Sequence, residues 1–143
     1  MKALPTFMKL FRGIIDEDFS KQIDWLKWNG AKLLQSCNRH ATLIHGDFRL
    51  DNLFYKDDGS DPVLIDFQAV NLFNPMADVA YFLRPNLNDE TVGFELQLVR
   101  FFWEALNSNG VRDYPWEDCQ IDYELAQWWL VHRGVIIIGL MEF

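Results

Sequence analysis

The chain has 143 residues, of which 13 are basic and 21 are acidic, so its formal net charge is −8. This length is typical of a single domain, and a hydrophobic share of 50% excludes a disordered chain. The acidic balance disfavours non-specific binding of nucleic acid, which requires a basic surface. We therefore expect one folded domain, residues 1–143, that does not bind nucleic acid.

The sequence contains no pattern typical of export or membrane insertion. Its two cysteines, Cys37 and Cys119, lie far apart and predict no disulfide framework. The N-terminal residues lack the sustained apolar run of a signal peptide. The most apolar segment, 135–141, is too short to cross a bilayer, which takes about 20 residues, and it predicts a buried helix end. We expect a cytoplasmic protein that binds no membrane.

The first part of the chain changes from helical to strand-like spacing of its apolar residues. Residues 19–34 predict an amphipathic helix, with Asp16 or Asp18 as its N-cap. Short β-type runs follow at 42–44, 53–55 and 63–65. A turn containing Asp58 and Gly59 separates the last two runs and predicts a β-hairpin.

Helical patterns dominate the remainder of the chain. Pro75 fits the first turn of a helix, and Asn88 fits a cap before the next helix, which Gly110 would end. Pro115 precedes the last and longest pattern. The expected helices cover 76–83, 92–106 and 116–140. This order of elements predicts an α+β fold that is mainly α.

Two groups of polar residues follow the short strands. The segment from His45 to Asn52 follows the first strand, and Asp66 follows the third. Phosphoryl transfer needs one carboxylate for the acceptor hydroxyl, and a second carboxylate with an amide oxygen for Mg²⁺. Asp47 and Asn52 have the spacing of the corresponding Asp and Asn in the protein-kinase catalytic loop.

Segments 45–52 and 64–68, together with 75–80, resemble motifs of the aminoglycoside phosphotransferase and choline kinase-like superfamily. Members of this superfamily are small-molecule kinases with the protein-kinase-like fold. The resemblance covers about residues 42–83, and the order of its motifs makes it specific. It implies that the chain forms the C-terminal, catalytic lobe of that fold, with the small β-hairpin cluster carrying the catalytic and metal loops.

The resemblance also implies a role for each polar residue of these segments. Asp47 would be the catalytic base, or would orient the acceptor hydroxyl of a small molecule. Asn52 and Asp66 would bind Mg²⁺ on the phosphates of ATP, the co-substrate. His45 would brace Asp66 without transferring protons. Asp78 would accept hydrogen bonds from the backbone of the catalytic loop.

The sequence leaves the partner of Asp66 open. Because Asp66 follows the apolar run 63–65, we expect its carboxylate at a buried strand end, where it requires a partner. A metal ion is one candidate, and Arg49 or Arg84 is the alternative. Asp47, taken by itself, fits a turn or cap equally well. Only the ordered set of motifs favours a catalytic role.

Five aromatic residues on the later helices could surround a cationic acceptor, although aromatic residues at helical spacing more often belong to the core. They are Phe102, Trp103, Trp116, Trp128 and Trp129. The net charge of −8 suits a cationic acceptor, and it suits an ordinary soluble surface equally. A dinuclear metallophosphatase is a weaker alternative, because that site needs several histidines and the chain has 3.

A kinase of this type also needs a lobe that covers the nucleotide with a Gly-rich loop and a strand lysine. Residues 1–41 contain neither pattern, so this N-terminal lobe is expected to be absent from the sequence. The helical pattern through 141–143 likewise suggests a partial chain. We expect the chain alone to be inactive, with a complementing N-lobe or a second copy as partner. The alternative is a non-catalytic remnant, a pseudokinase-like binding module.

Overall fold

A computed structural model describes residues 3–140. The helices are α1 (Leu4–Leu10), α2 (Glu17–Cys37), α3 (Met76–Asn86), α4 (Glu95–Ser108) and α5 (Trp116–Leu140). The strands are β1 (Thr42–Ile44), β2 (Leu53–Phe54), β3 (Val63–Leu64) and β4 (Asn71–Phe73). The predicted α+β class, mainly α, is therefore confirmed. The helical pattern expected at 141–143 lies outside the described residues.

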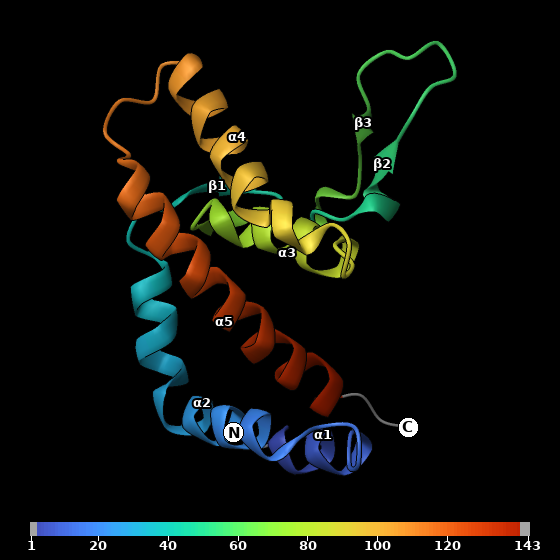
Figure 1. The fold of residues 1–143 in the computed structure, drawn as a ribbon, viewed down its shortest axis with the longest axis vertical. Helices are drawn as coiled ribbons and strands as arrows, with labels where there is room; N and C mark the ends of the chain where they lie inside the picture. Colours follow the sequence, from blue (N-terminus) through green and yellow to red (C-terminus); the bar gives the residue numbers. More distant parts are fainter. Residues whose placement is uncertain (1–2, 141–143) are drawn as a thin grey trace.

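The strands form two separate antiparallel pairs. β2 and β3 pair with Leu53 opposite Leu64, which confirms the predicted hairpin. This hairpin extends away from the helices (Figure 1). β1 pairs with β4, a strand that the sequence pattern did not predict, and Leu43 lies opposite Leu72. The second pair holds the loop after β1 beside the segment that leads into α3.

The N-terminus of α2 confirms one of the two predicted caps. Oδ1 of Asp16 accepts a hydrogen bond of 2.7 Å from the N–H of Phe19. Asp18 instead lies in the first turn, where its negative charge favours the helix N-terminus. The helix continues past its predicted end to Cys37, because Cys37 is buried in the core between α2 and α5.

The later helices differ from the prediction only at their ends. α3 extends to Asn86 and includes Pro85 in its last turn. Residues 92–94, which contain a glycine, form a 3₁₀ turn, so α4 begins at Glu95. α5 follows Pro115 as predicted.

α5 is the helix against which the other four helices pack (Figure 1). It carries buried residues along its whole length, from Cys119 to Gly139. Apolar residues on several sides are typical of a helix with neighbours on several sides. Tyr123 packs in the core with α3 and α4, whereas Val135 packs with α1 and α2. α5 therefore connects the N-terminal helices to the elements that carry the polar loops.

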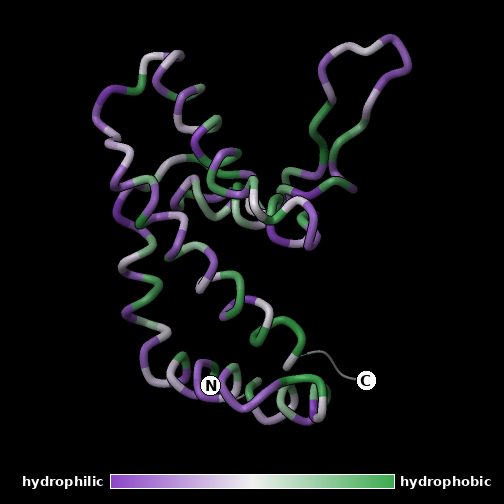
Figure 2. The backbone as a smooth tube through the Cα atoms, viewed as in Figure 1, coloured by the Kyte–Doolittle hydropathy of each residue, from purple (hydrophilic) through white to green (hydrophobic). Residues whose placement is uncertain are grey.

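The C-terminal end of α5 is buried on one side. It consists mostly of hydrophobic residues (Figure 2). Val135 is buried, whereas Ile137 and Leu140 are 48% and 63% exposed. The predicted buried helix end is thus correct for one face, on which α1 and α2 pack. Within residues 3–140, no helix is both long and apolar enough to cross a membrane.

The aromatic residues of α4 and α5 do not form a single cage. The guanidinium of Arg100 lies 4.4 Å from the ring centroid of Trp103 and 4.7 Å from that of Trp116. The chain therefore supplies its own cation there. The remaining aromatic pairs join α5 to α2 and β4, as Trp128 with Trp25 and Trp129 with Phe73. This arrangement favours the core interpretation over a cationic acceptor site.

Candidate active site

The loop after β1 is fixed by the first turn of α3. Asp78 accepts hydrogen bonds from two successive backbone N–H groups, at 2.6 Å from His45 and 2.9 Å from Gly46. A carboxylate in the first turn of a helix is favoured by the helix dipole. Because both bonds go to one carboxylate, Asp78 sets the direction in which the chain enters Asp47.

Asp47 and Asn52 are joined directly. The amide nitrogen of Asn52 donates to the backbone oxygen of Asp47 at 2.8 Å and to its Oδ2 at 3.2 Å. Asn52 is buried and lies in a 3₁₀ turn that ends at β2. Since the amide nitrogen is engaged by Asp47, the amide oxygen is the atom left to contact a cation. The sequence spacing of five residues thus corresponds to a contact between the two side chains.

His45 connects this loop to the segment that carries Asp66. Its Nε2 lies 2.8 Å from the backbone oxygen of Ile65, and its Nδ1 lies 3.3 Å from the backbone nitrogen of Asp47. A carbonyl can only accept and an N–H can only donate. We assign the neutral tautomer with the proton on Nε2, because it alone satisfies both contacts. In this role the ring braces the backbone and has no free nitrogen for proton transfer.

Asp66 lies directly after β3 in a left-handed backbone conformation, with φ 63° and ψ 62°. It is the only residue other than glycine with a positive φ among residues 3–140. Such a conformation is costly outside glycine and often occurs at functional sites. The N–H of Ile65 donates to the backbone oxygen of Asn52 at 3.0 Å. The two candidate metal ligands are therefore neighbours through the backbone.

The burial expected of Asp66 is wrong, and the arginine alternative has no support in the structure. Its carboxylate is exposed, because the hairpin has no neighbouring sheet and Ile65 itself is 38% exposed. Neither arginine pairs with it within the described part of the chain. Arg49 lies 3.5 Å from Asp47 Oδ2, and Arg84 lies 3.2 Å from Glu95 Oε1. Asp66 instead accepts a long contact of 3.4 Å from the side chain of Gln68.

The residues present suit Mg²⁺ better than a metal held wholly by protein. No group of three or more His, Cys, Asp or Glu gathers around a common point within residues 3–140. Mg²⁺ in phosphoryl-transfer sites takes oxygen ligands, usually one or two from carboxylates and the others from phosphates and water. An exposed Asp66 carboxylate and the amide oxygen of Asn52 fit this donor set.

Three residues at the site have no signal in the sequence motifs. Arg133 of α5 donates to the backbone oxygen of Gly46 at 2.6 Å. Its guanidinium lies 4.9 Å from the ring centroid of Tyr81 and 5.3 Å from that of Trp129. Burial, together with the nearby Asp47 carboxylate, raises the pKa of the Tyr81 hydroxyl. An arginine within an apolar stretch was the only hint available in the sequence.

Two cavities flank the catalytic loop. A largely apolar cavity of about 540 Å³ is lined by β1, His45, Phe48 and Phe67, but not by Asp47 or Asp66. A smaller cavity of about 350 Å³ is lined by charged, polar and apolar residues, which are Arg49, Leu50, Asp51, Tyr81, Pro85 and Asn86. Because Arg49 and Tyr81 both lie beside Asp47, the smaller cavity opens next to the candidate catalytic carboxylate.

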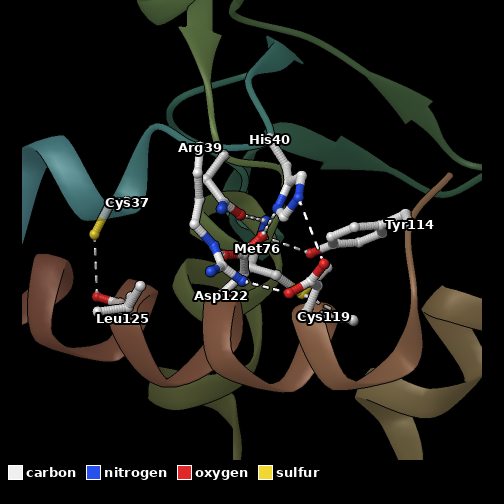
Figure 3. Close-up of polar contacts among 10 residues, drawn as sticks. Cys37, Arg39, His40, Met76, Tyr114, Cys119, Asp122 and Leu125 are labelled. Atoms are coloured by element: carbon white, nitrogen blue, oxygen red, sulfur yellow. Dashed lines mark hydrogen bonds and ion pairs between the residues drawn. The ribbon is translucent and has the colours of Figure 1, made fainter.

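A second polar cluster anchors the residues that lead into β1 (Figure 3). Asp122 of α5 is fully buried, and its Oδ1 accepts 2.8 Å from Nε of Arg39. Its Oδ2 contacts His40 Nδ1 at 2.6 Å and the Tyr114 hydroxyl at 3.0 Å. Burial by itself raises the pKa of Asp122, but the hydrogen bonds from Arg39 and His40 outweigh it and lower that pKa. The cluster fixes the start of β1 to α5.

Both cysteines are free, in line with the predicted lack of a disulfide framework, and both are buried. Burial raises the pKa of Cys37 and of Cys119 to about 11. Sγ of Cys37 lies 3.5 Å from the backbone oxygen of Leu125, joining α2 to α5 (Figure 3). Since the thiolate is the reactive form of cysteine, these thiols are structural.

In this mainly helical fold, the loops hold Asp47 and Asn52 together and place them next to the segment that carries Asp66. A model of the Ecdysteroid kinase-like family matches residues 2–109, well over half of the chain. The chain belongs to this family, which is part of the protein-kinase-like fold superfamily. The narrower resemblance to aminoglycoside and choline kinases stays a prediction.

Two curated proteins are similar over shorter segments. Acyl-CoA dehydrogenase family member 10 of Mus musculus is 43% identical over 81 residues, 56% of this chain. Probable acyl-CoA dehydrogenase IBR3 of Arabidopsis thaliana is 40% identical over 60 residues, 41% of this chain. The matched segment covers 7% of each relative, so the chain spans a small part of these longer proteins.

Proposed function

We propose that this chain carries the catalytic residues of a phosphotransferase that moves the γ-phosphoryl group of ATP to a hydroxyl of a small molecule. The observation that carries the proposal is the connected set of Asp47, Asn52 and Asp66. Asn52 bonds to Asp47 through its side chain and to the residue before Asp66 through its backbone. The family to which the chain belongs supports a kinase-type reaction.

Asp47 is the residue that would contact the acceptor. Its carboxylate accepts a hydrogen bond from the acceptor hydroxyl and aims that oxygen at the γ-phosphorus. As the new O–P bond forms, the bond from the γ-phosphorus to the bridging oxygen of ATP breaks, and ADP leaves. The hydroxyl proton passes to Asp47. Asn52 keeps the Asp47 carboxylate in place through its contact at 3.2 Å.

Asn52 and Asp66 would hold Mg²⁺ on the nucleotide phosphates through the amide oxygen and the carboxylate. When bound, the ion neutralises phosphate charge that develops in the transition state. His45 and Asp78 act through the backbone of the loops. They hold the two loops together through Ile65, Gly46 and the backbone of Asp47.

Two observations bear on the class of acceptor. A net charge of −8 is compatible with a cationic acceptor. The smaller cavity contains Asp51 and Asn86, which offer oxygen atoms to such a molecule. The family name points to a hydroxylated small molecule of another kind. Both share the feature that the mechanism requires, a free hydroxyl.

The first experiment measures binding of Mg·ATP to the full-length protein that contains this chain. We expect Mg·ATP at 100 times its Kd to stabilise the fold by about 2.7 kcal/mol, seen as a rise in Tm. Asp66→Ala should abolish the Mg²⁺-dependent part of this rise. Asp57→Ala, at the exposed hairpin tip, is the control and should keep it.

Activity separates the roles of the two carboxylates. Asp47→Asn should keep the Tm rise and lose phosphoryl transfer, because Asp47 faces the acceptor and not the metal. ADP release in the presence of a panel of hydroxylated small molecules measures transfer. Absence of any Tm rise in the unmodified protein would contradict the proposal. A rise without turnover on any acceptor would favour a pseudokinase-like binding module.

A further inference from the structure

Arg133 reaches the catalytic loop from the far end of the sequence. Its Nη1 donates to the backbone oxygen of Gly46 at 2.6 Å, and its Nη2 lies 4.0 Å from Oδ1 of Asp47. One guanidinium nitrogen thus bonds the peptide before Asp47, and the other lies at ion-pair distance from the carboxylate of Asp47. A planar group with several donors can make both contacts at once.

The guanidinium of Arg133 is held in place by aromatic rings from two helices. Tyr81 of α3 and Trp129 of α5 have ring centroids 4.9 Å and 5.3 Å from its central carbon. Only 25% of the Arg133 side chain is exposed. Stacking on aromatic faces favours arginine and limits the orientations that its side chain can adopt. Arg133 is therefore a fixed part of the loop's surroundings.

Arg133 completes the set of contacts on the backbone around Asp47. Asp78 accepts from the N–H of Gly46 at 2.9 Å, and the N–H of Asp47 points to His45 at 3.3 Å. Asn52 donates to the carbonyl of Asp47 at 2.8 Å. The carbonyl of Gly46 is held by Arg133. Each polar backbone atom from the Gly46 nitrogen to the Asp47 oxygen thus has a partner.

Arg49 is the other cation beside Asp47, and it is held less firmly than Arg133. Its Nε lies 3.5 Å from Asp47 Oδ2, and its Nη1 lies 3.5 Å from Asp51 Oδ2. The Arg49 side chain is 47% exposed, and it divides its charge between two carboxylates. Exposed ion pairs contribute little and are screened by salt. Arg133 is the more buried of the two arginines.

We propose that Arg133 is a positioning residue for phosphoryl transfer, which holds the Gly46–Asp47 peptide and directs the Asp47 carboxylate toward the acceptor hydroxyl. This inference rests on the proposed function. Arg133 lies outside residues 2–109, the segment that matches the family. The final helix therefore takes part in the site through Arg133 and the ring of Trp129 that supports it.

The test compares Arg133→Ala, Arg133→Lys and Arg100→Ala in the full-length protein. Arg100 is a matched control, because its guanidinium also stacks on two aromatic rings, but it belongs to α4 and pairs with Glu104. We expect Arg133→Ala to lower kcat by about 10²-fold, the cost of a misplaced catalytic group. KM for ATP should change little, because Asn52 and Asp66, the residues proposed to hold Mg²⁺ on the nucleotide, are unchanged.

Two rescue measurements separate positioning from folding. Arg133→Lys should retain more kcat than Arg133→Ala, because an ammonium can still bond the Gly46 carbonyl. It should retain less than the unmodified protein, because an ammonium lacks the planar group that reaches both Gly46 and Asp47. Methylguanidinium added to Arg133→Ala should restore part of kcat. Arg100→Ala should keep kcat near that of the unmodified protein. A kcat unchanged by Arg133→Ala, or lowered equally by Arg100→Ala, would overturn the proposal.

Hydrogen exchange tests whether Arg133 orders the loop, and this measurement does not require an active enzyme. The N–H groups of Gly46 and Asp47 both donate to side chains, and they should exchange faster in Arg133→Ala than in Arg100→Ala, with Arg133→Lys between the two. Exchange in folded Arg133→Ala that equals exchange in Arg100→Ala would overturn the proposed contact. If the unmodified protein transfers no phosphoryl group, the proposed function fails, and exchange still shows whether Arg133 orders the loop.

Discussion

Gly46 lies at a point of close approach between the loop after β1 and the segment that leads into β4. Its φ is +78°, a conformation that is accessible to glycine and costly for other residues. A Cβ at this position would collide with the backbone oxygen of Ala69 and lie 3.1 Å from Nδ2 of Asn71. Both the conformation and the space require glycine beside the candidate catalytic carboxylate.

Replacing Gly46 by alanine should lower the free energy of unfolding by more than conformational strain alone. A residue held in a strained backbone region costs about 1–3 kcal/mol, and the collision with Ala69 adds to it. Gly59→Ala is the control, since Gly59 has φ +72° and a Cβ there would meet no other described residue within 4 Å. Urea unfolding measures both variants, and equal losses would contradict the role of close packing at Gly46.

Single residues also explain which parts of the site the sequence reveals. Asp47 and Asn52 lie in one short loop, so their spacing predicts their contact. Arg133 belongs to α5, and no local pattern records that its guanidinium reaches Gly46. The exposure of Asp66 was missed because an apolar strand has the same composition in a buried sheet and in an exposed hairpin.

At the scale of elements, α5 fixes the strand that leads into the catalytic loop. Asp122, near its start, holds Arg39 and His40 at 2.8 Å and 2.6 Å, just before β1. At its other end, Arg133 holds the loop after β1. The same helix therefore positions β1 from both sides.

Asp122→Asn should destabilise the protein by about 1.5–3 kcal/mol, the contribution of hydrogen bonds to a charged group. An amide keeps the shape of the carboxylate but presents its N–H₂ group to donors such as Arg39. Asp118→Asn is the control, because Asp118 also pairs with Arg39 but has a side chain 35% exposed. Exposed pairs contribute about 0–1 kcal/mol. Chemical denaturation should therefore show a clearly smaller loss for Asp118→Asn, and equal losses would argue against a buried anchor.

Elements with local signals were predicted well, whereas β4, which has no such signal, was not. The hairpin follows from a turn at Asp58 and Gly59, and the start of α2 follows from its Asp16 cap. β4 consists of three residues whose strand state depends on pairing with β1. A pairing across such a distance in the chain leaves no periodic pattern in so short a run.

For the molecule as a whole, two buried groups make stability depend on pH in the same direction. Burial lowers the pKa of His132 below its usual value of 6.5. Asp122 also has a lowered pKa in the folded protein. A group with a lowered pKa binds its proton more readily in the unfolded chain, so acid favours unfolding. Each group contributes its full stabilisation at a pH above its pKa in the unfolded chain. This contribution is lost as the pH falls toward the pKa of the group in the folded protein.

His132→Leu should reduce the loss of stability between pH 7 and pH 5. His132 is buried between α5 and α2, where a Cβ on Gly30 would lie 2.6 Å from its Nε2. At low pH the imidazole of His132 takes up a proton when the unmodified protein unfolds, and this uptake favours unfolding. The leucine of the variant takes up no proton. Tm measured across this range checks the slope, and an identical slope in His132→Leu would refute the assignment.

The β2–β3 hairpin has a consequence for how the protein behaves at high concentration. Its unpaired edges carry exposed apolar side chains, with Phe54 58% and Tyr55 65% exposed. Free strand edges promote intermolecular β-pairing, and charged residues near them oppose it. The tip of the hairpin carries Asp57, Asp58 and Asp61. Mutual repulsion of these tips would keep neighbouring copies apart, so the acidic turn serves solubility as well as chain reversal.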